Sequence, residues 1–358
     1  MKIAILGAGN GGCAMAADWS LAGHEARLFD FRDFPTQIEA IDRKGGIQTE
    51  GELSGFAPVA YAGHDISKAT AGAELIVAVG PAYSTEPLAR ELKPHLAAGQ
   101  TVVVSPGSTG GGLLFKRILG YKTGDPSVTV AETSTLPYAA RLIEPGKVHV
   151  YLKLKGGIYL SALPSEASAG VLEQFDTIYK CIQLGENYFQ TMLQNANPVI
   201  HPAVTLLNAG RIENTQGDFL FYEEGVMPGV GRLIAAVDSE RIAIGKALGV
   251  TVFPDTVIGI KQGYMTSDSY EIDYRTAPGF KGIKAQPRLD HRYLNEDVGY
   301  GLVLLQEMGE ALGVDTPHID AIITLASTVT GRDYRAEARR TLAGMGLPAG
   351  KALRTARL

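Results

Sequence analysis

The sequence opens with a short apolar run, Lys2-Ile3-Ala4-Ile5-Leu6, which continues directly into Gly7-Ala8-Gly9-Asn10-Gly11-Gly12. The apolar run predicts a buried β-strand, and the glycines form the pattern GxGxxG at a turn into a helix. Gly7 permits a tight turn, Gly9 leaves room for a pyrophosphate against bare backbone, and Gly12 lets the helix pack closely on the sheet. The helix N-terminus then faces the phosphates. The stretch therefore predicts a dinucleotide-binding unit.

The residues after the glycine turn support this interpretation and bear on the choice of cofactor. Context matters, because 43 of the 358 residues are glycine and a glycine-rich turn in an unrelated α/β protein is the plain alternative. A small-residue helix after the turn leads to a second strand, Glu25–Phe29, which ends at Asp30. An acidic side chain at this point accepts both hydroxyls of an adenosine ribose and favours NAD. Arg32 keeps NADP open, because its guanidinium could instead reach a 2′-phosphate.

Composition excludes several classes of protein. With 45% hydrophobic and 20% charged residues, the 358-residue chain is globular in composition and long enough for two domains. Its net charge of −5, without long runs of like charge, argues against nucleic-acid or membrane partners and favours a small molecule. Cys13 and Cys181 form neither a disulfide framework nor a metal cluster, so we expect no metal and a cytoplasmic location. The first apolar run is too short for a signal peptide.

Strand patterns dominate the first half of the chain. Continuous apolar runs at residues 75–79, 101–104 and 128–131 predict strands that are buried on both faces of a parallel sheet. Residues 148–154 and 157–163 flank Lys-Gly and predict a hairpin. A last short strand is expected near residues 180–184. We therefore expect an α/β Rossmann domain, a parallel doubly wound sheet plus a hairpin.

From about residue 187, helical periodicity replaces the strand patterns. Apolar residues at helical spacing predict one helix that ends at Gly249 and another that begins near Val298. The predicted domains are therefore a dinucleotide-binding domain at 1–186 and an all-α substrate and catalytic domain at 187–358. The polar and aromatic stretch 264–289 is too long for an idle connector. It is either an irregular loop over the cleft or a solvent-exposed insertion.

The carboxyl ends of the predicted strands carry further candidate cofactor contacts, because open α/β sheets bind their ligands at that edge. The strand at 75–79 is followed by Gly80-Pro81, and the strand at 128–131 by Glu132-Thr133-Ser134. The predicted cofactor-binding residues are Gly7, Gly9, Asn10, Gly12, Asp30, Arg32, Pro81, Glu132, Thr133 and Ser134.

Two polar islands in the helical half are candidates for catalysis. A nicotinamide carries the hydride, so the protein must supply an acid/base group, most often histidine. Asn197 and His201 interrupt an apolar stretch and would share a helical face at i, i+4, although neighbouring prolines distort it. A histidine packed in a helical core is the alternative.

The second island is Asp290-His291-Arg292-Tyr293-Leu294-Asn295-Glu296-Asp297. Its last three residues are of the types found at a helix N-cap and first turn. A carboxylate at this position could equally fix the tautomer of an imidazole, and Arg292 offers a bidentate fork for a substrate carboxylate. The residues by themselves leave both interpretations open.

Taken together, these motifs resemble the opine dehydrogenases, particularly the bacterial N-(1-carboxyethyl)-norvaline dehydrogenase branch, over nearly the whole chain. The motifs that carry the resemblance are the glycine turn, Glu132-Thr133-Ser134, Asn197-Pro198-Val199-Ile200-His201-Pro202 followed by Thr205-Leu206-Leu207-Asn208-Ala209, Asp238-Ser239-Glu240-Arg241-Ile242-Ala243, and Arg292 with Asp297. In that family a Rossmann domain is joined to a helical domain. The enzymes condense an α-keto acid with an amino acid and reduce the imine with NAD(P)H.

The resemblance implies roles for individual residues. His201 would be the acid/base residue, Asp297 its carboxylate partner, and Arg292 an anchor for a substrate carboxylate. Asn197 is the second candidate for substrate binding, and His291 is an alternative member of the site. The resemblance further implies NAD as cofactor, with NADP as the alternative, keto-acid and amino-acid substrates, and a homodimer formed through the helical half.

Two rival functions have different requirements. A ketone reductase of the 2-dehydropantoate reductase or glycerol-3-phosphate dehydrogenase type would need a cleft lysine, and the available lysines (Lys155, Lys246 and Lys261) lie in no such motif. A non-catalytic dinucleotide sensor would bind cofactor without turnover. Tyr264, Tyr270 and Phe280 either line an amino-acid pocket or pack the 264–289 loop down.

Overall fold

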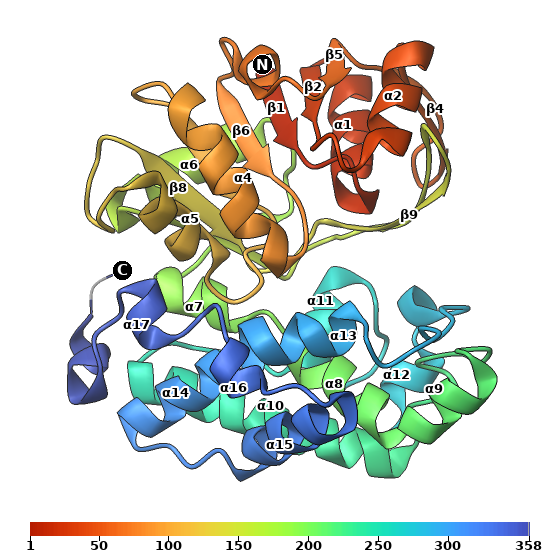
Figure 1. The fold of residues 1–358 in the computed structure, drawn as a ribbon, viewed down its shortest axis with the longest axis vertical. Helices are drawn as coiled ribbons and strands as arrows, with labels where there is room; N and C mark the ends of the chain where they lie inside the picture. Colours follow the sequence, from red (N-terminus) through yellow and green to blue (C-terminus); the bar gives the residue numbers. More distant parts are fainter. Residues whose placement is uncertain (357) are drawn as a thin grey trace. The chain divides into compact units, whose positions relative to one another are not determined.

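The structure is a computed structural model that describes residues 1–356 and residue 358. The described chain forms two compact units, of which the first is Met1–Thr191 and the second begins at Met192 (Figure 1). This division lies inside helix α7 (Tyr188–Leu193), a few residues after the predicted boundary at 186. Within the described chain, no helix combines the length and the apolar character that crossing a membrane requires.

The first unit is built around an eight-stranded sheet in the order β12-β11-β8-β7-β6-β1-β2-β5. Strand β1 lies between β2 and β6 and pairs in parallel with both, which is the doubly wound arrangement predicted from the apolar runs. The strands of this unit are β1 (Lys2–Leu6), β2 (Glu25–Phe29), β3 (Gly46–Gly51), β4 (Gly55–Pro58), β5 (Tyr61–Gly63), β6 (Leu75–Ala78), β7 (Thr101–Val104), β8 (Thr129–Thr133), β9 (Tyr138–Glu144), β10 (Lys147–Lys153), β11 (Ile158–Leu163) and β12 (Ile182–Leu184).

Helices cover both faces of this sheet, which is why its central strands are apolar on both sides. Leu88, Leu92 and Phe115 belong to a core cluster that joins two helices to the sheet on one face. Trp19 of α1 meets Phe175 of α6 edge-on, with ring centroids 5.8 Å apart. The helices of this unit are α1 (Asn10–Leu21), α2 (Pro35–Lys44), α3 (Ile66–Thr70), α4 (Thr85–Leu92), α5 (Gly111–Leu119) and α6 (Ser168–Asp176).

The predicted hairpin is wrong in its partners. Strand β10 pairs antiparallel with the preceding β9, in a separate four-stranded sheet of order β4-β3-β10-β9. Strand β11 instead lies in the main sheet, between β8 and β12. Burial alternates along much of β10, whereas all of β11 is buried. Two apolar runs separated only by Lys155-Gly156 have the spacing of a hairpin. The two strands nevertheless belong to different sheets.

The second unit is helical, which confirms the predicted fold class for this half of the chain. Helix α10 is the helix predicted to end at Gly249, which lies in the left-handed region at φ +76°. The helices of this unit are α8 (Asn197–Leu207), α9 (Ala209–Thr215), α10 (Pro228–Leu248), α11 (Asp255–Gln262), α12 (Asp273–Thr276), α13 (Arg292–Asn295), the π-helical segment η5 (Asp297–Leu302), α14 (Val303–Leu312), α15 (Pro317–Thr330), α16 (Tyr334–Glu337) and α17 (Leu342–Met345).

The second polar island does not form the N-cap that its residue types suggested. The helical segment begins at Arg292, and His291 caps it by accepting a hydrogen bond from the Tyr293 N–H. Asp297 consequently lies one turn further on, inside the helical segment, where it is buried. Its carboxylate therefore does not cap the helix and instead contacts His201.

The stretch 264–289 is largely irregular, as predicted, but it is not a solvent-exposed insertion. Its only regular pieces among the described residues are α12 and a 3₁₀ turn, η4 (Pro278–Phe280). Tyr274 is completely buried and donates a hydrogen bond to Asp255, while Tyr270 donates to Asp238. Two phenols thus tie the loop to α10 and α11.

Candidate active site

The centre of the candidate site is His201, in the second turn of α8. Pro198 is tolerated at the start of this helix because the first amides of a helix need no intrahelical partner. Pro202 lies inside the helix and removes one hydrogen bond of its ladder. Only 5% of His201 is exposed, and its ring stacks on that of Tyr293, with centroids 4.0 Å apart and planes 21° apart.

The structure brings Asp297 to His201 across 96 residues of sequence, with Oδ2 lying 2.8 Å from Nδ1. Both side chains are buried, so water does not screen the interaction. Burial raises the pKa of the Asp297 carboxyl to about 7, and the nearby charge of Arg292 opposes this rise. The pair is therefore suited to hold a proton near neutral pH and to fix the orientation of the imidazole.

A third group of the site, Tyr222, was not predicted from the sequence. Its hydroxyl lies 3.1 Å from His201 Nε2, on the side of the ring opposite Asp297. Tyr222 follows Phe219-Leu220-Phe221, an apolar and aromatic run whose expected role is core packing. A polar phenol at the end of such a run is a weak signal that it needs a partner, but nothing local identifies that partner as His201.

Arg292 and His291 flank the ring of Tyr293. About 44% of the Arg292 side chain is exposed, and its Nη1 lies 3.4 Å from Glu296 Oε2. His291 meets Tyr293 edge-on at 4.6 Å. Burial, together with the charges of Arg292, His201 and Arg288, lowers the pKa of His291 to about 4. At neutral pH His291 is therefore an uncharged helix cap, whereas Arg292 carries a positive charge whose contact with a substrate carboxylate stays a prediction.

The remaining substrate-site candidates lie at the start of α8 and in the loop. Asn197 is half-buried at the first position of α8, on the helical face predicted for it. Phe280 stacks on Tyr222 with centroids 4.2 Å apart, and Tyr264 stacks on Phe280 at 5.1 Å. Tyr270 donates its phenol to Asp238, so its hydroxyl is used to hold the loop.

In the first unit, the glycine turn fits a dinucleotide pyrophosphate. A Cβ on Gly7 would lie 2.0 Å from the Val79 carbonyl oxygen, and one on Gly12 would lie 1.8 Å from the Gly7 carbonyl oxygen. Close packing of the backbone therefore excludes side chains at Gly7 and Gly12. A Cβ on Gly9 would meet nothing within 4 Å, so the fold itself leaves the space over Gly9 open. Such a space beside the start of α1 suits a phosphate.

Asp30 and Arg32 lie at the end of β2, as predicted. The Asp30 carboxylate accepts hydrogen bonds from the backbone N–H of Ala8 and of Phe31, each at 2.8 Å. Burial raises the pKa of Asp30, and these two bonds oppose the rise. Asp30 therefore braces the glycine turn and has lone pairs left for a ribose hydroxyl. Arg32 is exposed.

The other predicted cofactor residues have mixed surroundings. Asn10 is exposed and accepts a hydrogen bond from the Leu142 N–H, and Pro81 is half-buried. Glu132, Thr133 and Ser134 are buried. The Glu132 carboxylate accepts from Tyr188, and the Ser134 hydroxyl accepts from the backbone of β11. Their contacts within the unit hold the carboxyl edge of the sheet, and their contact with a cofactor stays a prediction.

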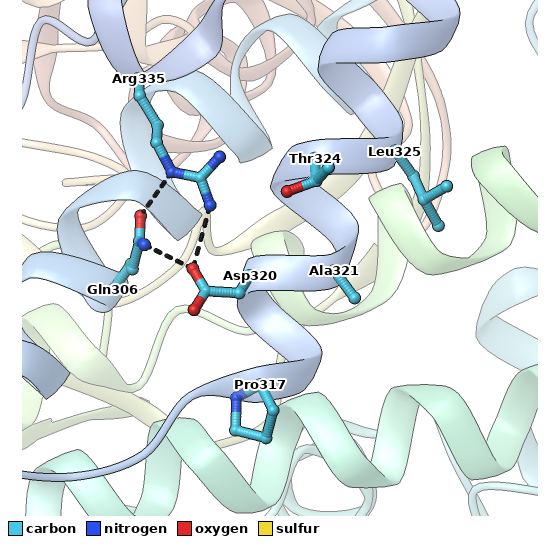
Figure 2. A pocket seen from close by; sticks show the side chains of 7 residues that line it. All are labelled: Gln306, Pro317, Asp320, Ala321, Thr324, Leu325 and Arg335. Carbon is cyan, nitrogen blue, oxygen red and sulfur yellow. Dashed lines mark hydrogen bonds and ion pairs between the residues drawn. The ribbon is translucent and has the colours of Figure 1, made fainter.

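A hollow of about 680 Å³ lies elsewhere, on the surface formed by α14, α15 and α16 (Figure 2). Its polar lining is satisfied internally, because Arg335 donates to Gln306 and to Asp320, and Gln306 donates to Asp320. It includes none of the residues that surround His201. The hollow is shallow and open, unlike the enclosed sites that bind small substrates.

Comparison with known proteins settles the family. Residues 184–330 match the family described as NAD/NADP octopine/nopaline dehydrogenase, alpha-helical domain. An opine dehydrogenase of Arthrobacter sp. (strain 1C) is 38% identical over 347 residues, covering 96% of this chain and 94% of the relative. The chain belongs to the opine dehydrogenase family. It is an NAD(P)-dependent oxidoreductase of this family, as the motifs predicted.

More distant similarities extend over most of the chain. The protein named ocs of Agrobacterium tumefaciens (strain Ach5) is 29% identical, covering 93% of this chain and 92% of the relative. The solved structure of octopine dehydrogenase in complex with NADH and agmatine has a TM-score of 0.76 at 19% identity, with 92% of this chain and 89% of that one covered. This last likeness shows a common fold.

The first unit also explains why a glycerol-3-phosphate dehydrogenase is a rival interpretation of the sequence. Residues 2–130 match the NAD-dependent glycerol-3-phosphate dehydrogenase N-terminus. That match is confined to the cofactor unit, whereas the helical half that contains His201 and Asp297 matches the octopine/nopaline dehydrogenases. This chain thus matches a glycerol-3-phosphate dehydrogenase family only in its cofactor unit, and not in the half that carries the candidate catalytic groups.

Proposed function

We propose that this opine dehydrogenase condenses an α-keto acid, with pyruvate as the first candidate, with an amino acid and reduces the resulting imine, and that it also catalyses the reverse oxidation. The observation that carries the proposal is the buried pair of His201 and Asp297, 2.8 Å apart, beside the half-exposed Arg292. The pair supplies a proton donor and acceptor, and Arg292 supplies a cation for a carboxylate.

When bound, NAD(P)H supplies the hydride that reduces the imine carbon. Gly7, Gly9 and Gly12 would cradle its pyrophosphate, and Asp30 would accept its ribose hydroxyls. We propose NAD as the preferred cofactor because the Asp30 carboxylate would repel a 2′-phosphate, with Arg32 leaving NADP use as the alternative.

In the condensing direction, Arg292 binds the keto-acid carboxylate, and Asn197 is the second substrate contact. His201 accepts a proton from the amino group, which then attacks the keto carbon. His201 then gives up a proton for the hydroxyl that leaves as water. Asp297 lies at Nδ1 throughout and stabilises the imidazolium that forms in between. The stacked rings around His201 exclude water and so strengthen these charge interactions.

The test is oxidation of NADH and of NADPH by the purified protein, with pyruvate alone and with a panel of amino acids added. Oxidation that requires both substrates is expected, and the faster cofactor identifies the preference. Oxidation with a keto acid alone would mean ketone reduction and would contradict the proposal. Cofactor binding without turnover on any pair would favour the sensor.

Two further expectations concern the cellular context. We propose a cytoplasmic location, supported by two free cysteines and no disulfide among the described residues. We also propose a homodimer formed through the helical half. Sedimentation equilibrium of the full chain tests the oligomeric state, and a mass equal to one chain would contradict it.

A further inference from the structure

Both ring nitrogens of His201 are occupied by protein groups. Asp297 lies 2.8 Å from Nδ1, and the Tyr222 hydroxyl lies 3.1 Å from Nε2. Each of the three residues is only 5% exposed. A substrate atom can therefore exchange a proton with His201 in two ways: it displaces Tyr222 from Nε2, or it receives the proton through Tyr222.

Tyr222 is held firmly, which argues against displacement. Its ring stacks on Phe280 at 4.2 Å with the planes 19° apart, and it meets Phe221 edge-on at 5.0 Å. Phe280 is backed in turn by Tyr274 at 5.9 Å, whose own hydroxyl is bonded to the buried Asp255. Moving the Tyr222 ring aside would break these stacked contacts and open a void in a packed region.

The electrostatic surroundings keep the hydroxyl protonated. Burial raises the pKa of Tyr222 well above its ordinary value, the phenols of Tyr293 and Tyr264 add to the rise, and the charge of Arg292 opposes it. A neutral phenol can accept one hydrogen bond and donate another at the same time, which a relay requires. The Arg292 guanidinium, which we propose binds the keto-acid carboxylate, lies 5.6 Å from the centre of the Tyr293 ring, and that ring stacks on His201.

We propose that Tyr222 is a catalytic residue that relays the proton between His201 Nε2 and the reacting substrate. This inference rests on the proposed condensation. When the hydroxyl of the carbinolamine leaves, its C–O bond breaks and its oxygen takes the Tyr222 proton to form water. The nitrogen lone pair forms the C=N bond, and His201 Nε2 returns a proton to the Tyr222 oxygen. One proton is consumed, two protons move, and no redox change occurs in this step.

The decisive variant is Tyr222→Phe, which keeps the stacked ring and removes only the hydroxyl. We expect kcat for condensation to fall about 10²-fold or more, while NADH binding is unchanged. The double variant with His201→Ala should be no slower than the slower single variant, because the two groups act in one relay. Tyr334→Phe is the matched control, because it likewise removes one buried phenol from the same unit, and its partner at 2.8 Å, Asn295, has no proposed catalytic or substrate-binding role.

A second measurement needs no variant and so does not depend on whether Tyr222→Phe folds. In mixtures of H₂O and D₂O, two protons in flight give a curved dependence of kcat on deuterium fraction, and one gives a straight line. A straight line for the wild type would overturn the relay. A Tyr222→Phe enzyme whose kcat lies within about twofold of the wild-type value would also overturn the relay. An equal loss of kcat in Tyr334→Phe would overturn it as well. If the wild type condenses no pair at all, the proposed function fails instead.

Discussion

Replacing Asp297 by asparagine should stabilise the protein at neutral pH while it removes activity. Burial raises the pKa of this carboxyl from 3.8 in the unfolded chain to about 7 in the folded one. Above pH 3.8 the unfolded chain releases the proton, whereas the folded chain keeps it until the pH approaches 7. Folding thus becomes less favourable as pH rises through this window, because the unfolded state binds fewer protons.

The size of the effect follows from the width of the window. Each pH unit between the two pKa values costs the folded state about 1.4 kcal/mol. From pH 5 to pH 7 the wild type should therefore lose about 3 kcal/mol of unfolding free energy that Asp297→Asn keeps. This figure is an upper bound, because an imidazolium at His201 would offset part of the cost of the carboxylate charge. Turnover should fall about 10²- to 10⁴-fold, since an amide does not stabilise the imidazolium.

The assay is urea unfolding, monitored by far-UV circular dichroism at pH 5 and at pH 7.5. The slope of the unfolding free energy against urea concentration is compared between variants. Asp218→Asn is the control, because Asp218 is exposed and its bond to Lys284 lowers its pKa. The contribution of Asp218 to the unfolding free energy is present above the ordinary pKa of an aspartate and is lost as the pH falls. This pH dependence has the opposite sign to that expected for Asp297. An advantage of Asp297→Asn that is the same at both pH values would refute the reasoning.

Four further predictions concern the candidate site and the glycine turn. His201→Ala should lower kcat about 10²- to 10⁴-fold and leave NADH affinity unchanged, as measured by steady-state kinetics and fluorescence titration; near-normal turnover would contradict its acid/base role. Arg292→Lys should raise KM for the keto acid at least tenfold, because a lysine cannot make the bidentate contact, and an unchanged KM would remove Arg292 from substrate binding. Gly12→Ala should destabilise the fold by about 1–3 kcal/mol or more, because its methyl group would overlap the Gly7 carbonyl oxygen. Gly9→Ala should keep the wild-type melting temperature and weaken cofactor binding, because its methyl group meets only open space; weaker folding without a change in affinity would contradict this.

The structural features that the sequence predicts correctly depend on residues that are close together in the chain. The run Lys2–Leu6 is apolar because β1 is covered on both faces, and Gly7 is required because the turn adopts φ +117° against the backbone of Val79. Gly249 and Gly313 end their helices in the left-handed region, where glycine pays little steric cost. In each case one short stretch contains the full physical requirement.

The incorrect predictions concern contacts between segments that are far apart in the sequence, which no short stretch of residues specifies. The sequence does not predict strands β3 and β4, and the Lys155-Gly156 spacing predicts that β10 pairs with β11, although these two strands belong to different sheets. The residue types at Asn295–Asp297 suit both a helix N-cap and an active site, so the sequence leaves both interpretations open. Only the backbone path, which begins the helix at Arg292, distinguishes the two.

The sequence by itself determined the dinucleotide-binding turn, the division into a sheet half and a helical half, and the candidates His201, Arg292 and Asp297. The turn and the division follow from patterns of burial and backbone conformation that repeat over a few residues, whereas the three candidates follow from the two polar islands and from the resemblance to the opine dehydrogenases. The tertiary structure alone decided that Tyr222 meets Nε2 of His201 and that burial moves the pKa of Asp297 to about 7. Contacts between distant segments and the loss of water around them depend on how the helices pack, so they exist only in the folded chain.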